Sequence, residues 1–219
     1  LVHDLREPRS LAEARLREVR ERLFSHLDDG ARLAIVRAPP GSGKTTLLLE
    51  ATLHALKAGR RVAIATQTNA QADDICRRLA ETGTRCVRFV SRDYDYDPPS
   101  SAIGVTKETG ELPTGACVVV ATAHKWGITE IRDVFDILCI DEAWQMPWQL
   151  FMPCVAVAGR FVLIGDPGQI PPVVAVPVKR WETARVPPHR PAPDVILRDD
   201  SVTKLTLDLP VSRRLPHDS

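Results

Sequence analysis

Short apolar segments alternate with helical segments along most of the chain. Six of these apolar segments lie at 33–36, 62–65, 86–90, 117–121, 137–140 and 161–164. Several are continuously apolar, which is the pattern of parallel strands covered on both faces. Two helical segments, 45–57 and 70–82, separate the first three, and each stops at a glycine. This alternation predicts an α/β fold with a mostly parallel sheet flanked by helices.

The ends and the interruptions of this pattern suggest how the domain is organised. Residues 1–29 contain apolar residues at helical spacing, Leu16, Val19, Leu23 and Leu27, and we expect an amphipathic helix there. Residues 30–219 then form the α/β domain, with a late strand near 202–207. Two proline-bearing stretches, about 91–114 and 171–193, are expected to be long surface loops.

Charge and cysteine content limit the functional classes to which this protein can belong. The chain has 29 basic and 28 acidic residues, so any binding of nucleic acid must come from a local groove. It has no signal peptide and no apolar run long enough to span a membrane, and we expect no membrane partner. Five cysteines without a CxxC pair indicate reduced thiols and a cytoplasmic protein. Because the chain begins with Leu1 rather than Met, we expect a part of a longer protein.

A glycine-bearing loop follows the first predicted strand and leads into the first central helix. Its sequence, at 38–46, is APPGSGKTT. Backbone N–H groups and a helix N-terminus in this arrangement bind phosphates, Lys44 adds a cation, and the Thr45 hydroxyl is a ligand for Mg²⁺. The alternative is a fortuitous turn before a helix. The residues expected around the phosphates are Pro40, Gly41, Ser42, Gly43, Lys44, Thr45 and Thr46.

Polar side chains follow two later strands. Asp141 and Glu142 come directly after 137–140, where open α/β sheets bind ligands. We expect Asp141 to hold Mg²⁺ and Glu142 to deprotonate an attacking water. The alternative is that Asp141 only caps a helix. Gln169 follows the strand at 161–164 and is a candidate sensor of a γ-phosphate, with an ordinary Gly-Pro turn as the alternative.

These three segments, taken in order, resemble the motifs of superfamily 1 helicases. The phosphate loop corresponds to Walker A, 141–145 (DEAWQ) to a DEAxQ box, and 165–171 (GDPGQIP) to a GDxxQLxP box in which Ile170 replaces Leu. The similarity is greatest to the Upf-like branch, which contains RNA-decay and DNA-replication nuclease-helicases. The resemblance implies the first RecA-like motor domain, with ATP and Mg²⁺ as cofactors and a second RecA-like domain elsewhere in the full-length chain.

Three weaker segments extend the resemblance. Residues 65–69 are similar to motif Ia and 119–124 to motif Ib, which implies that Thr68, Asn69 and Thr122 contact single-stranded DNA or RNA, and His124 is a further candidate for this contact. Residues 211–216 resemble motif IV, which implies that Arg214 reaches the γ-phosphate. His124, Lys125 and Trp126 could provide charge and a stacking face, or Trp126 could be packed inward. We expect core packing for Trp144 and Trp148.

Departures from the family pattern leave several functions open. The family usually has a glutamine before Walker A that reads adenine, whereas the first glutamine here is Gln67, and Arg213 replaces a tyrosine. The nucleobase is therefore open. We expect a helicase-like NTPase that hydrolyses slowly as an isolated piece. The alternatives are a nucleotide-binding switch and an ATPase that acts on a protein partner. The sequence does not predict strand separation, direction of movement, or DNA over RNA.

Overall fold

A computed structural model describes residues 9–132, 134–170, 172, 178–181 and 183–210. These residues form one eight-stranded sheet in the order β4-β3-β5-β2-β6-β7-β1-β8, and every neighbouring pair is parallel. The strands are β1 Leu33–Arg37, β2 Arg61–Thr66, β3 Cys86–Phe89, β4 Ile103–Thr106, β5 Cys117–Thr122, β6 Ile137–Ile140, β7 Phe161–Gly165 and β8 Leu205–Asp208. The predicted parallel sheet is confirmed.

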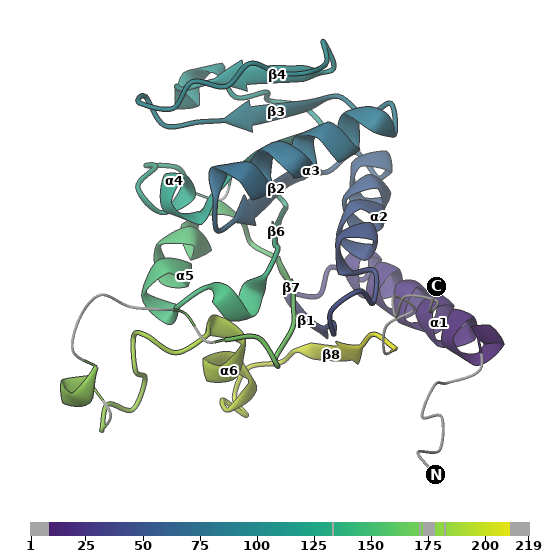
Figure 1. The fold of residues 1–219 in the computed structure, drawn as a ribbon, viewed down its shortest axis with the longest axis vertical. Coiled ribbons are helices and arrows are strands. Elements are labelled where there is room, and N and C mark those ends of the chain that lie inside the picture. The colour runs from purple at the N-terminus through teal and green to yellow at the C-terminus, as the bar shows by residue number, and fades with distance from the viewer. Residues whose placement is uncertain (1–8, 133, 171, 173–177, 182, 211–219) are drawn as a thin grey trace, which may run out of the picture.

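Helices cover both faces of this sheet (Figure 1). The helices are α1 Arg9–Asp28, α2 Lys44–Lys57, α3 Asn69–Glu81, α4 Ala123–Gly127, α5 Trp148–Cys154 and α6 Ala192–Leu197, with 3₁₀ turns η1 Thr109–Glu111, η2 Ala143–Gln145, η3 Val155–Val157 and η4 Lys179–Trp181. Leu23, Leu47 and Leu79 of α1–α3 share one core with alternate strand residues. Trp126 and Phe151 belong to a second core under α4–α6. Because both faces are covered, the central strands β1, β5, β6 and β7 are almost continuously apolar.

The N-terminal helix is packed onto the domain. Leu23 and Leu27 of α1 are buried within the first core. The Arg60 guanidinium donates to the Leu27 carbonyl at 2.6 Å, and Arg20 of α1 pairs with Glu50 of α2 at 2.9 Å. The predicted amphipathic helix is therefore present, and its apolar stripe is covered by the α/β unit.

One expected loop needs correction. The stretch 91–114 contains the edge strand β4, which pairs with β3, and the turn η1. The strand was not predicted because it has only four residues and Gly104 interrupts its apolar pattern. In the stretch 171–193, η4 and the start of α6 are described, while 171, 173–177 and 182 lie outside the described residues. The late strand, expected at 202–207, is β8, Leu205–Asp208.

The strand order determines what lies together at the carboxyl edge of the sheet. Strands β1, β7 and β6 are neighbours, and β6 also pairs with β2, which pairs with β5. In a parallel sheet, the segments after these strands emerge at one edge. None of the helices within the described ranges has the length and apolarity that crossing a membrane requires.

Candidate functional site

Two glycines with positive φ shape the loop between β1 and α2. Gly41 has φ 70° and Gly43, the residue before α2, has φ 91°, both in the left-handed region that favours glycine. The Ser42 amide donates to the Pro39 carbonyl at 3.1 Å, and the Ala38 amide donates to Gly165 of β7 at 2.7 Å. The loop therefore curls at the N-terminus of a 14-residue helix, where unpaired amides and the helix dipole favour an anion.

The predicted lysine and carboxylates converge at this helix terminus. Lys44 Nζ forms an ion pair with Glu142 Oε1, and their side chains are only 16% and 15% exposed. Asp141 directly follows β6, and its amide donates to Ala65 of β2 at 3.0 Å. Burial, together with the smaller effect of the adjacent Glu142 charge, raises the pKa of the Asp141 carboxyl to about 6. Two carboxylates and one ammonium thus share a confined site at the end of the phosphate loop.

Three buried oxygens at the site accept no hydrogen bond within the described part of the chain. They are Asp141 Oδ1, Glu142 Oε2 and Ser42 Oγ. Carboxylate and hydroxyl oxygens are the ligands that Mg²⁺ prefers, and Mg²⁺ usually takes its remaining ligands from water and substrate phosphates. The described residues hold no group of three His, Cys, Asp or Glu side chains suited to a metal on their own. The donor set therefore fits a cation that a polyphosphate brings with it.

The backbone around Glu142 is unusually tight. Glu142 has φ 50°, and it is the one non-glycine residue with positive φ among those described. A Cβ on Gly165 of β7 would lie 2.8 Å from the Ala143 amide nitrogen and 3.1 Å from that of Trp144. Real Cβ contacts are longer than this, so the turn after β6 can approach β7 only because residue 165 is glycine.

A side-chain hydrogen bond connects this turn to the candidate sensor. Gln145 Nε2 donates to Gln169 Oε1 at 3.1 Å. The loop that carries Gln169 is shaped by Asp166, whose Oδ1 accepts the Gly168 amide at 2.8 Å and whose carbonyl accepts the Gln169 amide at 3.2 Å. A displacement of Gln169 would therefore be transmitted to the turn that carries Glu142.

A cavity of about 260 Å³ lies beside the phosphate loop, between the loop and α1. Its apolar lining includes Ala12 and Leu16 of α1 and Pro210 after β8. Its charged lining is Arg20 and Glu50, which pair with each other at 2.9 Å. A group attached to a phosphate in the loop can extend into this cavity.

The four residues predicted to contact nucleic acid lie after two paired strands. Thr68 and Asn69 follow β2, and Thr122 and His124 lie at the end of β5, whose register aligns Thr66 with Thr122. The Thr68 hydroxyl accepts the Gln71 amide at 3.2 Å in a capping box at the start of α3. Thr68 and His124 are exposed. The structure thus brings these residues to one edge of the sheet, next to the phosphate site.

Thr122 and the aromatic residues near it have structural roles. The Thr122 hydroxyl accepts the Lys125 amide at 3.2 Å at the start of α4. Trp126 is buried, and its Nε1 donates to the Ile64 carbonyl at 2.9 Å, so the inward-packed alternative is correct. Lys125 is turned over the Phe89 ring, 4.1 Å from its centroid. Trp126 therefore has no exposed face on which a nucleobase can stack.

Two further tryptophans pack as expected. Trp144 is 3% exposed, and its Nε1 donates to Asp194 Oδ1 at 2.8 Å. Trp148 is half-buried against Phe151, with ring centroids 5.5 Å apart. Arg214, with the whole segment 211–216, lies outside the described residues.

Sequence reasoning missed three residues that the site depends on. Gly165 and Gln145 lie within two of the recognised sequence motifs. The close contact of Gly165 with the turn after β6 and the hydrogen bond from Gln145 to Gln169 are tertiary contacts that these motifs do not reveal. Arg88 lies on β3 and is fully buried beside the start of α3. A charged residue within an otherwise apolar segment was the available signal, because a buried charge needs partners.

Comparisons with known proteins agree with this geometry. The family model described as an AAA domain matches residues 18–185. The DNA replication ATP-dependent helicase/nuclease DNA2 of Saccharomyces cerevisiae is 28% identical over 151 residues, 64% of this chain and 10% of that protein. The mouse DNA-binding protein SMUBP-2 is 41% identical over 57 residues, 26% of this chain and 6% of that protein. The chain thus spans about a tenth or less of the length of these relatives.

A solved structure supports the fold. The arterivirus nonstructural protein 10 helicase in complex with DNA matches with a TM-score of 0.53 and 17% identity, over 92% of this chain and 40% of that one. At this identity the likeness concerns the fold alone. The family match covers more than half of the chain and includes the phosphate loop and both acidic residues. The chain therefore belongs to the AAA domain family, and the relatives to which it is similar are a replication helicase/nuclease and a DNA-binding protein.

Proposed function

We propose that this domain binds ATP with Mg²⁺ and hydrolyses it while it engages single-stranded nucleic acid. The observation that carries the proposal is the convergence of Lys44, Asp141 and Glu142 at the phosphate loop, with buried oxygens free to take further ligands. A buried carboxylate that hydrogen bonds do not satisfy is costly unless a cation or water serves it. The site is therefore built for a metal-bound anion.

The chain's own residues divide the binding of the triphosphate among them. The amides at the start of α2 and the Lys44 ammonium hold the phosphates. The Thr45 hydroxyl and the Asp141 carboxylate would hold Mg²⁺, Asp141 through Oδ1 or a water bound to it. When bound with the nucleotide, Mg²⁺ would supply positive charge that offsets the charge developing on the phosphates.

Glu142 is the proposed general base. Its Oε1 is held by Lys44, whereas its Oε2 is buried without a hydrogen-bond partner in the described residues. Oε2 is therefore the atom that can accept a proton from an attacking water. The left-handed backbone at Glu142 fixes the position of this carboxylate relative to the end of β6.

The loop after β7 would report the γ-phosphate to the rest of the domain. Gln169 is the proposed sensor, and its bond to Gln145 links it to the turn of Asp141 and Glu142. By resemblance, Arg214 would also reach the γ-phosphate and stabilise its transition-state charge. A second RecA-like domain in a longer chain would close the site from the other side.

The nucleoside is proposed to occupy the cavity between α1 and the phosphate loop. The cavity adjoins Gly41 and Gly43 and is lined by apolar side chains and by the Arg20–Glu50 pair. These two charged groups form an ion pair at 2.9 Å, and no amide side chain lines the cavity in the described chain. Because base selection depends on placed hydrogen-bonding groups, we expect only modest preference for ATP over other nucleotides.

Single-stranded nucleic acid is proposed to cross the edge formed by the ends of β2 and β5. Thr68, Asn69, Thr122 and His124 supply hydroxyl, amide and imidazole groups suited to phosphate oxygens. The names of the relatives support this proposal, because DNA2 is described as a DNA replication helicase/nuclease and SMUBP-2 as a DNA-binding protein. Proximity of this edge to the phosphate site allows binding at one to affect the other.

Phosphate release tests the proposal directly. It should require Mg²⁺, increase when single-stranded DNA or RNA oligonucleotides are added, and be lost in Glu142→Gln, which should still bind nucleotide. Turnover without any response to nucleic acid would favour an ATPase that acts on a protein partner. Nucleotide binding without Glu142-dependent turnover would favour a binding switch. Either result would contradict the proposed coupling.

A further inference from the structure

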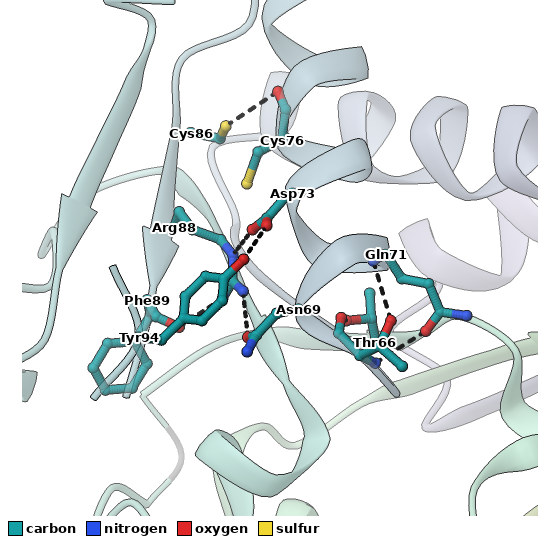
Figure 2. Close-up of polar contacts among 10 residues, drawn as sticks. Thr66, Asn69, Gln71, Asp73, Cys76, Cys86, Arg88, Phe89 and Tyr94 are labelled. Carbon is teal, nitrogen blue, oxygen red and sulfur yellow. Dashed lines mark hydrogen bonds and ion pairs between the residues drawn. The ribbon is translucent and has the colours of Figure 1, made fainter. Parts of the chain in front are cut away.

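A buried arginine joins the start of α3 to the strand beside it (Figure 2). Arg88 lies on β3, and its side chain is 0% exposed. Its Nε donates to Asp73 Oδ1 at 2.7 Å, its Nη2 to Asn69 Oδ1 at 2.7 Å, and its Nη1 to the Phe89 carbonyl at 3.0 Å. Every nitrogen of this guanidinium therefore has an acceptor, as a buried charge requires.

Two tyrosine rings flank the ion pair of Arg88 with Asp73. Tyr94 donates to the second oxygen of Asp73, Oδ2, at 2.6 Å, so both carboxylate oxygens are engaged. The Arg88 guanidinium carbon lies 5.6 Å from the Tyr94 ring centroid and 5.9 Å from that of Tyr96. A planar guanidinium with three directed bonds and two aromatic neighbours has little freedom to reorient.

The chemistry of arginine fixes the orientation of the Asn69 side chain. A guanidinium has five N–H donors and no acceptor, so the atom of Asn69 that faces Arg88 must be the carbonyl oxygen. The amide NH₂ group is then directed away from Arg88, as Figure 2 shows. No hydrogen bond from this NH₂ group occurs within the described residues, and Asn69 is partly exposed. Asn69 thus presents two oriented donors at the start of α3.

These donors lie at the N-terminus of α3, a position that favours a phosphate. Asn69 is the first residue of α3 and follows Thr68, whose hydroxyl oxygen caps the helix and whose O–H proton can be donated outward. Donors at the N-terminus of a 13-residue helix suit a phosphate oxygen. Fixing a donor before binding removes the entropy cost of ordering it on binding.

We propose that Arg88 is a positioning residue for nucleic-acid binding: from within the core it holds Asn69 so that its amide NH₂ donates to the backbone of a single strand. The inference rests on the proposed binding of nucleic acid at this edge. Arg88 itself touches no nucleic acid, and it acts through Asn69 alone. Affinity for a single strand therefore depends on a buried cation on β3.

A double-mutant cycle tests the inference. The readout is the Kd for a fluorescein-labelled oligothymidylate, measured by anisotropy. Asn69→Ala should weaken binding about tenfold, the loss expected for a hydrogen bond to a charged group. Arg88→Lys keeps the buried charge beside Asp73 but cannot reach three acceptors, and it should weaken binding several-fold. In the Asn69→Ala background, Arg88→Lys should have no further effect.

Tyr94→Phe is the matched control. It removes the Tyr94 hydrogen bond to Asp73 in the same cluster but leaves the Arg88 contact with Asn69 in place. It should leave the Kd for oligothymidylate and the unstimulated phosphate release unchanged. If Arg88→Lys weakens binding equally in both backgrounds, or Tyr94→Phe weakens binding as much as Arg88→Lys, the positioning role is wrong while nucleic-acid binding stands. If the unmodified chain binds neither oligothymidylate nor oligouridylate, the proposed function fails first.

A measurement on the unmodified chain does not depend on any variant folding. The ¹⁵N relaxation of the Asn69 side-chain amide should show it to be as rigid as the backbone before oligothymidylate is added. Its NH₂ resonances should then shift on binding. A freely rotating Asn69 side chain in the unbound chain would contradict the inference.

Discussion

At the scale of single residues, Asp141 shows how function conflicts with stability. Burial, together with the smaller effect of the neighbouring Glu142 charge, raises the pKa of its carboxyl to about 6. The charged form is therefore less favourable in the folded chain than in the unfolded chain. As pH rises from about 4 through about 6, the folded protein must release a proton that it holds more tightly, and the free energy of unfolding falls.

Asp141→Asn should therefore make the chain more stable while removing its activity. The shift corresponds to roughly 2–3 kcal/mol, which the variant should gain above about pH 6, with the gain shrinking toward pH 4. Denaturant unfolding across this pH range measures it. Asp200→Asn, which changes an exposed carboxylate, controls for the loss of one negative charge. A variant less stable than the unmodified chain at pH 8 would contradict this account of Asp141.

The site residues that belong to a local sequence motif could be predicted from the sequence. Gly43, Lys44 and Asp141 follow predicted strands at the carboxyl edge, and a parallel sheet brings such residues together. Arg88 was not predictable in the same way. Its partners lie 15 and 19 residues away on α3, and nothing local specifies how a helix is placed against a strand.

At the scale of elements, the contact between β7 and the turn after β6 is the tightest in the site. Gly165→Ala would place a Cβ 2.8 Å from the backbone nitrogen of Ala143, and backbone cannot rotate away as a side chain can. We expect a loss of about 1–3 kcal/mol in unfolding free energy, as for other overpacked sites, together with a large loss of phosphate release.

Gly159→Ala is the control for Gly165→Ala. It precedes the same strand, its φ is not positive, and a Cβ there would meet nothing within 4 Å. It should change neither stability nor turnover appreciably. Thermal unfolding and Mg²⁺-dependent phosphate release compare the two variants. Equal behaviour would mean that the close approach of β7 to the turn does not matter.

The packing of α1 against the phosphate loop makes a second prediction at this scale. Leu16→Trp should fill much of the cavity beside the loop and so weaken binding of ATP and of GTP alike by about tenfold or more. Binding of inorganic tripolyphosphate, which has no nucleoside, should be unchanged. Fluorescent-nucleotide displacement measures all three ligands.

Leu11→Trp gives the matched control for the cavity. Leu11 is on the same helix, is 44% exposed, and does not line the cavity. It should leave all three affinities unchanged. If Leu16→Trp weakens tripolyphosphate as much as ATP, the cavity does not hold the nucleoside.

Which elements could be predicted depended on how each is covered. Strands β1, β5 and β7 are buried on both faces, and their continuous apolar runs identify them. Strand β4 is a short edge strand in which Gly104 and Val105 are exposed, so its pattern is that of a loop. Its pairing comes from β3 beside it, which is information that the local sequence does not contain.

At the scale of the whole molecule, the proposed function places the described residues on one side of the catalytic site, with a second RecA-like domain on the other. An arginine finger supplied from such a second domain would be worth about 10³-fold or more in rate. We therefore expect residues 1–219 to release phosphate slowly, well below the roughly 1–100 s⁻¹ at which kinases transfer phosphoryl groups. Single-turnover phosphate release with Glu142→Gln as the blank measures this. Fast turnover would mean that the chain completes its own site.

The balance of charge over the whole chain determines how nucleic-acid binding should respond to salt. The formal net charge is +1, so long-range attraction to a polyanion is weak. Three of the four proposed contacts, Thr68, Asn69 and Thr122, are uncharged donors, and such donors release few counterions when they bind phosphates. For single strands, the slope of log Kobs against log salt is about −0.7 per neutralised phosphate, so we expect a slope between 0 and about −1.

This slope distinguishes contacts made by uncharged groups from contacts made by Lys or Arg side chains. Asn69→Ala should lower the affinity for oligothymidylate at every salt concentration without changing the slope, because an uncharged amide releases no counterion from the nucleic acid when it binds a phosphate. A slope steeper than about −5 would require several Lys or Arg contacts with phosphates, and the single strand would then follow a basic groove elsewhere on the molecule. Salt titrations of the unmodified chain and of Asn69→Ala therefore decide whether the strand crosses the ends of β2 and β5.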